Sequence, residues 1–237
     1  MITNRTDDIQ HDLPLKTQQI KNSCGEHDSR YSFFTPAYLL MTQERERKLL
    51  KLLTERNITL ANKRILEVGC GKGAWLRDFV RWGARPENIC GVDIQPDRVA
   101  EARRLCSAGI TLTCQDATKL DVPDGSFDLV LQSTVFTSIL DQNTKRLLAQ
   151  EMMRVVHPKG LIVWYDFHIN NPGNRDVRGV HKKEIRQLFP DCNISLQKLT
   201  LAPPIGRMAA SISTTLYRVL SSIKPLCTHY LGIITKL

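Results

Sequence analysis

Three glycines at alternate positions, Gly69, Gly71 and Gly73, follow a short apolar strand predicted over residues 64–68. Glycine suits such a loop because a Cβ atom would obstruct a ligand that approaches the backbone closely, or would oppose a turn with positive φ. A helix is predicted directly after the loop, so its first N–H groups are free to donate to a ligand. This spacing favours the binding of a cofactor against the backbone.

Carboxylates close the neighbouring predicted strands. Glu67 stands two residues before the first glycine, and Asp93 and Asp116 come at the ends of strands predicted over residues 89–94 and 110–114. In an open α/β sheet, ligands bind beyond the carboxyl ends of the strands. We therefore expect these carboxylates to line the same crevice as the glycine loop, where they can accept hydrogen bonds from a ribose or a base.

Two cofactor classes fit this loop. The spacing Gly69-x-Gly71-x-x-Ala74 satisfies the dinucleotide fingerprint of NAD-dependent dehydrogenases, with Asp93 at about the distance expected of the acid that binds the ribose. The surroundings favour another class, in particular the acid after the third strand and the Phe-Asp-Leu-Val run that opens the fourth. A dehydrogenase and a non-catalytic cofactor-binding module stay open as alternatives.

The segments that must position the loop alternate between helix and strand. Apolar residues at helical spacing predict helices, and short apolar runs between turn residues predict strands. Helices are predicted over residues 36–56, 75–82, 96–107 and 144–156, and strands over residues 64–68, 89–94, 110–114, 127–131 and 161–167, with two more near 194–201 and 229–235. Five strands joined by helices imply a parallel, doubly wound sheet with right-handed crossovers.

Five short runs in this region carry a family likeness. They are residues 65–73 around the glycines, Gly91-Val92-Asp93-Ile94, Gln115-Asp116-Ala117, Asp124-Gly125-Ser126-Phe127-Asp128 and His157-Pro158-Lys159-Gly160. In order and register they closely resemble the motifs of class I S-adenosylmethionine-dependent methyltransferases, of the methyltransferase type 11-like kind, over roughly residues 61–167. The resemblance implies a Rossmann-like α/β fold, with a mostly parallel seven-stranded sheet, helices on both faces and an antiparallel last strand.

The resemblance also divides the chain. We expect a flexible N-terminal arm over residues 1–35 and one methyltransferase domain over residues 36–237. The expected parts of the domain are an N-terminal helix (36–60), a cofactor-binding core (61–167), and a substrate-side part with a loop, a cap helix and the last strands (168–237).

The cofactor that the resemblance implies is S-adenosylmethionine, whose methionine end would lie on the glycine loop. The loop residues assigned to it are Gly69, Cys70, Gly71 and Gly73. Glu67 would support the loop or the ammonium group, and Gln132 would offer backbone contacts to the same end. Cys70 is expected to be a small side chain in a tight turn and not a nucleophile.

The resemblance likewise assigns the nucleoside end of the cofactor. Asp93 would accept from both ribose hydroxyls, and Ile94 would lie against the adenine. Asp116 would accept from the adenine amino group, while the N–H of Ala117 would donate to the ring.

The acceptor side is expected after the fourth and fifth strands. Methyl transfer from a sulfonium is an in-line displacement, so the enzyme mainly has to align the acceptor and exclude water. A hydroxyl acceptor benefits from a base, for which Asp166 and His168 are the candidates, each with a structural role as the alternative. The residues expected to contact the acceptor are Ser133, Thr134, Thr137 and Arg178, the last through a phosphate.

Signatures of nucleic acid methylation are missing. Residues 132–137 lack the Asn/Asp-Pro-Pro-aromatic signature of enzymes that methylate exocyclic amino groups of bases, and no Pro-Cys nucleophile is present. Residues 165–167, 170–172, 176–179 and 228–232 are similar to small bacterial methyltransferases of glycan and secondary-metabolite pathways. We therefore expect O-methylation of a sugar or other small-molecule hydroxyl, with N-methylation or nucleic acid methylation as the alternatives.

The net charge of +9 is concentrated near the C-terminal end. Residues 175–237 hold ten Lys/Arg against three Asp/Glu, which favours an anionic partner or a solvated face. Seven cysteines show neither zinc-site spacing nor the density of a disulfide framework, so we expect thiols and no metal. No segment has the ~20 apolar residues of a membrane span. We expect a cytoplasmic protein, for which peripheral membrane contact and the oligomeric state stay open.

One later segment is predicted as an amphipathic helix. Over residues 205–223, six apolar side chains share one helical face, with Arg207 and Arg218 nearly opposite. The six are Met208, Ile212, Leu216, Val219, Leu220 and Ile223. We expect this face to pack on the core; a substrate cap or a membrane-surface element is the alternative.

Overall fold

The computed structural model describes residues 29–171 and 173–237, so most of the expected N-terminal arm lies outside the described residues. A seven-stranded sheet in the order β3-β2-β1-β4-β5-β7-β6 organises the fold. Its strands are β1 (Ile65–Val68), β2 (Ile89–Asp93), β3 (Thr111–Cys114), β4 (Phe127–Ser133), β5 (Val156–Phe167), β6 (Cys192–Leu201) and β7 (Cys227–Lys236). The first five are parallel, and β7 is antiparallel to both of its neighbours. The predicted fold class is confirmed.

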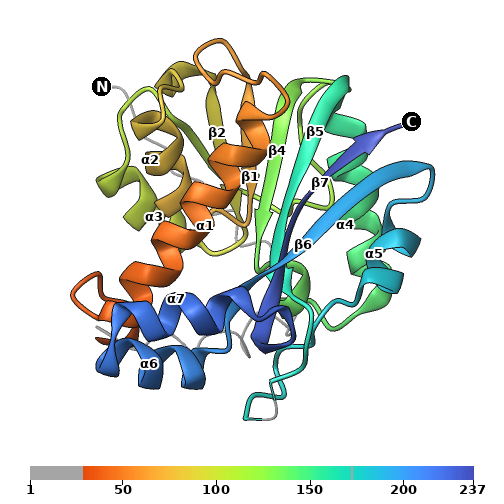
Figure 1. Ribbon diagram of the computed structural model, residues 1–237. Helices are drawn as coiled ribbons and strands as arrows, with labels where there is room; N and C mark the ends of the chain where they lie inside the picture. The colour runs from red at the N-terminus through yellow and green to blue at the C-terminus, as the bar shows by residue number, and fades with distance from the viewer. Residues whose placement is uncertain (1–28, 172) are drawn as a thin grey trace.

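Helices cover both faces of the sheet (Figure 1). The helices are α1 (Pro36–Thr54), α2 (Ala74–Arg81), α3 (Pro96–Leu105), α4 (Gln142–Val155), α5 (Lys182–Leu188), α6 (Pro203–Ile212) and α7 (Thr214–Ser222). One buried cluster lies between the sheet and α1, α2 and α3, and a second lies between the sheet and α4 and α5. Side chains of β1 alternate between the clusters, Ile65 in the first and Leu66 in the second, which is why its sequence is a continuous apolar run.

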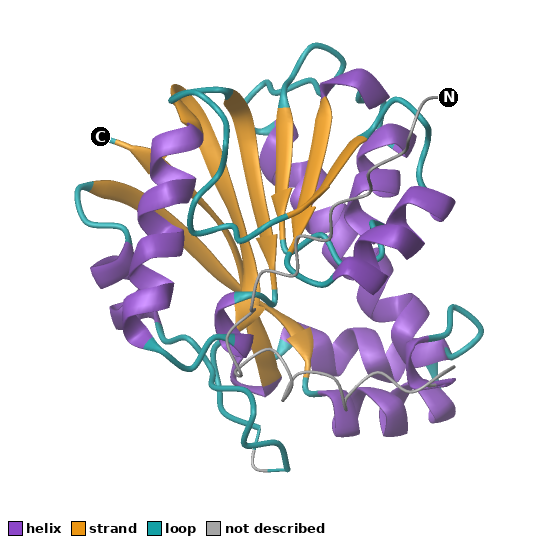
Figure 2. Ribbon diagram, turned by 180° about the vertical axis from the view of Figure 1, so that it is seen from behind, coloured by secondary structure: helices purple, strands orange, loops and turns teal. Residues whose placement is uncertain are grey.

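The carboxyl ends of the parallel strands lie at one edge of the sheet, on the side of the molecule where α6 and α7 are found (Figure 2). The loops after β1, β2, β3 and β4 therefore meet at this edge. We call it the carboxyl edge.

The fifth strand begins earlier than its sequence predicts. The run His157-Pro158-Lys159-Gly160 was expected to end the preceding helix, but it belongs to β5, which starts at Val156. Val156 pairs with Phe127, and the register shifts before Leu161 pairs with Leu129. Pairing with β4 thus overrides the turn-like composition of the run, which forms a bulge in the strand.

The helix expected over residues 205–223 is two helices, and the expectation that its apolar face packs on the core holds for Leu216 and Leu220 but not for the other four side chains. Ser213 separates α6 from α7 with extended backbone angles (φ −165°, ψ 138°), and its Oγ accepts from the N–H of Thr215. The buried positions of the pair include small ones, Gly206 and Ala209, which let the helices approach closely. Met208, Ile212, Val219 and Ile223 are exposed instead.

Within the described part of the chain, no helix is long and apolar enough to cross a membrane. The six cysteines in that part are free thiols. Residues 29–171 and 173–237 also contain no group of three His, Cys, Asp or Glu side chains that could hold a metal ion.

Candidate functional site

The glycine loop adopts the backbone that its sequence predicts. Gly69, Gly71 and Gly73 have φ values of 67°, 52° and 73°, in the left-handed region that disfavours other residues. A Cβ atom on Gly69 would overlap the side chain of Val135, whereas a Cβ atom on Gly71 would meet nothing within 4 Å. The space over Gly71 is therefore open, as a loop that receives a ligand requires.

Asp93 fixes this loop to the end of β2. Its Oδ2 accepts from the N–H of Gly71 at 2.8 Å, and its Oδ1 accepts from the N–H of Gln95 at 2.9 Å. An ionised carboxylate has about four lone-pair sites, so both oxygens can still accept from a ligand. The carboxylate predicted to bind a ribose thus also shapes the loop beside it.

Two buried side chains at the ends of adjacent strands leave polar atoms without a partner. Glu67 is 2% exposed, and its Oε2 has no hydrogen bond. Gln132 is fully buried; its Oε1 accepts from the N–H of Val135, but its Nε2 has no partner. Such atoms are rare in folded proteins because each costs free energy of desolvation. A ligand with complementary groups would satisfy them.

Burial raises the pKa of Glu67 well above its usual range, and the nearby charge of Arg45 opposes this by a smaller amount. The charged form of Glu67 is therefore costly unless a cation comes close.

Arg45, on α1, is a site residue that sequence reasoning missed. Its guanidinium carbon lies 4.0 Å from the centre of the Trp75 ring and 5.4 Å from that of Tyr165. Its Nε is buried without a partner, and no ion pair to Arg45 occurs within the described residues. The sequence offers no signal for this, because residues 44–47 read Glu-Arg-Glu-Arg, like any solvated turn of an amphipathic helix.

The residues predicted for the nucleoside end also lie at the carboxyl edge, after β2 and β3. Ile94 is 42% exposed although it is large and apolar. Asp116 is exposed, and its Oδ1 accepts from the N–H of Thr118 at 2.8 Å, which closes the turn that carries Ala117. Cys70, in contrast, is buried, and burial raises the pKa of its thiol. An uncharged thiol is a poor nucleophile, in agreement with a packing role.

Asp166 is oriented differently from the other acids. Its side chain has no exposed surface and accepts from the N–H and the hydroxyl of Thr137 and from the N–H of Phe167. Burial raises its pKa to about 7. These bonds join β5 to the short helix η4 (Phe136–Ser138). As placed, Asp166 can position Thr137 but has no surface with which to touch an acceptor.

His168 is also enclosed. It is 6% exposed, its Nε2 lies 2.9 Å from the carbonyl oxygen of Cys227, and its ring stacks on Tyr230 at 4.4 Å. Burial lowers the pKa of the imidazole, so the ring is neutral at neutral pH. One ring nitrogen is thus engaged by the backbone, which leaves Nδ1 for any proton transfer.

The other residues predicted to contact the acceptor are held by the loops after β4 and β5. Thr134 has a φ of 58°, and its N–H donates to the carbonyl of Tyr165. Ser133, just before it, is the half-buried last residue of β4. Arg178 donates to Glu184 through its side chain and to Thr137 through its N–H. The predicted phosphate ligand is therefore already engaged in an ion pair.

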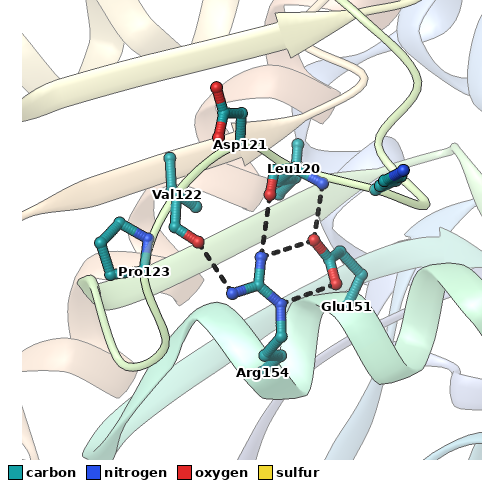
Figure 3. Close-up of a pocket in the computed structure, with 7 residues that line it drawn as sticks. Leu120, Asp121, Val122, Pro123, Glu151 and Arg154 are labelled. Carbon is teal, nitrogen blue, oxygen red and sulfur yellow. Dashed lines mark hydrogen bonds and ion pairs between the residues drawn. The ribbon is translucent and has the colours of Figure 1, made fainter.

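A surface cavity of about 510 Å³ lies elsewhere, between α4 and the connection from β3 to β4 (Figure 3). Arg154 crosses it and donates to the carbonyls of Leu120 and Val122 and to the carboxylates of Glu151 and Asp124. These bonds use the donors of the guanidinium and tie the connection to α4. We therefore interpret this cavity as structural and place the candidate site at the glycine loop.

Comparisons with known proteins agree with that placement. Residues 65–160 match a family model described as a methyltransferase domain. A solved S-adenosylmethionine-dependent methyltransferase from Mesorhizobium loti superimposes with a TM-score of 0.58 at 17% identity, over 82% of this chain and 99% of that one. Residues 65–160 thus resemble a methyltransferase domain, and the chain has the fold of a solved S-adenosylmethionine-dependent methyltransferase. That neighbour is named for S-adenosylmethionine, the cofactor that the resemblance of the sequence motifs implies.

Curated relatives of the methyltransferase domain have diverse names. The chain is 32% identical to 2-methyl-6-phytyl-1,4-hydroquinone methyltransferase of Synechocystis, over 53% of this chain and 38% of that protein. It is 34% identical to the fatty-acid O-methyltransferase of Mycolicibacterium smegmatis, over 48% of this chain and 40% of that protein. The chain thus spans about two-fifths of these relatives, and the names do not agree on one acceptor.

Proposed function

We propose that this protein binds S-adenosylmethionine and transfers its methyl group to an oxygen of a small-molecule acceptor. The observation that carries the proposal is that an acidic and a basic side chain near each other, Glu67 and Arg45, each keep a buried polar atom without a hydrogen bond, Oε2 and Nε respectively. Glu67 offers a carboxylate oxygen and Arg45 a guanidinium N–H, and neither satisfies the other. The amino-acid end of the cofactor carries an ammonium and a carboxylate, which match these two groups.

The remaining cofactor contacts follow from the same edge of the sheet. We assign Asp93 to the ribose, because its oxygens keep lone pairs after holding the loop. Ile94 would cover the adenine with its exposed apolar side chain, and the turn at Asp116 and Ala117 would meet the base edge. Gln132 would present its unpartnered amide group to the methionine end.

For the transfer step, the chain mainly has to hold the acceptor in line. When bound, the cofactor would supply a methyl group on a sulfonium: the acceptor oxygen would bond to the methyl carbon as the S–CH3 bond breaks, and S-adenosylhomocysteine would leave as a neutral thioether, a displacement that requires no metal. Ser133 ends β4, and Thr134 and Thr137 lie after it, where the three would orient an acceptor hydroxyl. Asp166 would act through Thr137 as a positioning residue.

The acceptor class is supported by observations other than those that support the cofactor. O-methylation of a sugar or another small-molecule hydroxyl agrees with the missing nucleic acid signatures, and one relative is named an O-methyltransferase.

Calorimetry with S-adenosylhomocysteine and with NAD tests the proposal. We expect S-adenosylhomocysteine to bind and NAD not to bind. Tight binding of NAD alone would support the dehydrogenase alternative. Because one structural neighbour with a TM-score of 0.56 is a [4+2]-cyclase, the fold alone does not fix methyl transfer. A transfer screen with labelled cofactor against sugars, phenols and fatty acids completes the test, and cofactor binding without any transfer would favour a non-catalytic module.

A further inference from the structure

A short sequence pattern recurs in the pair of helices α6 and α7. Residues 207–212 read Arg-Met-Ala-Ala-Ser-Ile, and residues 218–223 read Arg-Val-Leu-Ser-Ser-Ile. Each copy therefore has an arginine, an apolar residue and, four positions after that residue, an isoleucine. The first copy lies in α6, and the second lies in α7 and ends on its C-cap residue Ile223. Helix α6 packs against α7 and against α1 (Figure 1).

Each copy forms the exposed side of its helix. The four apolar side chains of the pattern are Met208 (60% exposed), Ile212 (68%), Val219 (55%) and Ile223 (42%). At about 100° per residue, each arginine lies roughly 100–140° around the helix from its apolar pair, at the other border of the same exposed arc. Large apolar side chains occur singly on most soluble surfaces, but four at matched positions on two adjoining helices form a stripe. We call these four residues and the two arginines the α6–α7 stripe.

The charge around the stripe has one sign. Residues 198–226, which include both helices, contain four Lys/Arg and no Asp/Glu. On the adjoining helix α1, Glu44 is the acid near Lys224, and it is only 8% exposed; Arg47 and Lys48 lie near it as well. An exposed surface that combines aliphatic side chains with cations complements a bilayer of anionic lipids, where the side chains enter the interface and the cations meet headgroups.

From these contacts and charges, we propose that the α6–α7 stripe docks the protein on the surface of an anionic lipid bilayer. A second copy of the chain is a poorer occupant, because a self-complementary contact would bring like charges together. Nucleic acid would satisfy the arginines but would leave the four aliphatic side chains against phosphates. The stripe lies on the carboxyl-edge side of the sheet, so docking would hold the glycine-loop side of the molecule toward the membrane. This docking surface goes beyond the proposed methyl transfer and does not depend on it.

Sedimentation with vesicles tests the docking surface on the full chain. We expect the protein to bind vesicles of phosphatidylglycerol and phosphatidylcholine in about equal parts, and to bind pure phosphatidylcholine at least tenfold more weakly. Raising the salt from about 0.05 M to about 0.5 M should release it, because the cations are exposed.

Two variants separate the contributions. Changing Met208, Ile212, Val219 and Ile223 to Ser removes the apolar part, and R207E with R218E reverses the charge. Each variant should weaken binding to anionic vesicles on the order of tenfold or more. The matched controls, L105S with L147S for exposed apolar residues and K159E for an exposed cation, should bind like the unchanged protein. All variants should keep their affinity for S-adenosylhomocysteine, so failure of docking and failure of the proposed function are distinguishable.

Three results would overturn the docking surface. The first is no binding of the unchanged protein to anionic vesicles, and the second is equal binding by the stripe variants. The third is a dimer in light scattering that the Ser variant, but not the controls, converts to a monomer, because this would identify the stripe as an interface between two copies.

Discussion

Replacing Glu67 with Gln tests two effects of the charge of this side chain: its contribution to cofactor binding and its cost to the stability of the cofactor-free protein. The change keeps the size of the side chain and removes its charge. Because Glu67 Oε2 is buried without a partner, a cofactor ammonium would make its bond with a desolvated carboxylate. Hydrogen bonds to charged groups contribute about 1.5–3 kcal/mol. We therefore expect the Kd of S-adenosylhomocysteine, measured by calorimetry, to rise about 10–150-fold in the variant.

The pH dependence supplies a second reading of the same change. The pKa of Glu67 is raised in the folded, cofactor-free protein. As the pH rises above about 4.5, this carboxyl ionises in the unfolded chain but stays protonated in the folded protein, so the folded protein loses stability. The variant lacks this loss, and its Tm should exceed that of the unchanged protein by an amount that grows with pH. Conversely, binding should strengthen with pH only in the unchanged protein, since binding needs the ionised form.

The control ligand is 5′-methylthioadenosine, which has the nucleoside and sulfur but no amino-acid end. Its affinity should be the same for the Gln variant and the unchanged protein. The control variant is Glu101→Gln, on α3, which should change neither ligand's affinity. If Glu67→Gln lowered the affinity for both ligands equally, or lowered neither affinity, the assignment of Glu67 to the ammonium would be refuted.

Three further predictions use the same measurements. Arg45→Met should keep the packing on Trp75 but weaken the binding of S-adenosylhomocysteine about tenfold, while the affinity for 5′-methylthioadenosine stays the same. An equal loss of affinity for both ligands would contradict a role of Arg45 toward the carboxylate of the cofactor. Asp93→Ala should weaken both ligands by about 1.5–3 kcal/mol and lower the Tm, because it removes the acceptor of two backbone N–H groups. Asp166→Asn should lower kcat while cofactor affinity stays constant, and high pH should not restore the rate; recovery at high pH would instead identify Asp166 as the base.

The glycine loop and the sheet could be predicted from the sequence because both depend on local requirements. Gly69, Gly71 and Gly73 need positive φ, and strands buried on both faces need continuous apolar runs. The division into α6 and α7 could not be predicted, because the helix is interrupted at the single residue Ser213 and no Gly or Pro stands at the break. Arg45 could not either, since its burial depends on Trp75 and Tyr165, which come from distant parts of the chain.

The placement of Asp166 shows that a position near the end of a strand does not by itself predict the direction of a side chain. Successive side chains of a strand point to opposite faces of the sheet. Trp164 belongs to the buried cluster under α4 and α5, and Asp166, two residues on, points to the same side. Tyr165 belongs to the cluster on the α1 side, where Arg45 lies over it. Alternation along β5 therefore turns an aromatic ring toward Arg45 and turns the carboxylate away from it, toward the N–H and hydroxyl of Thr137.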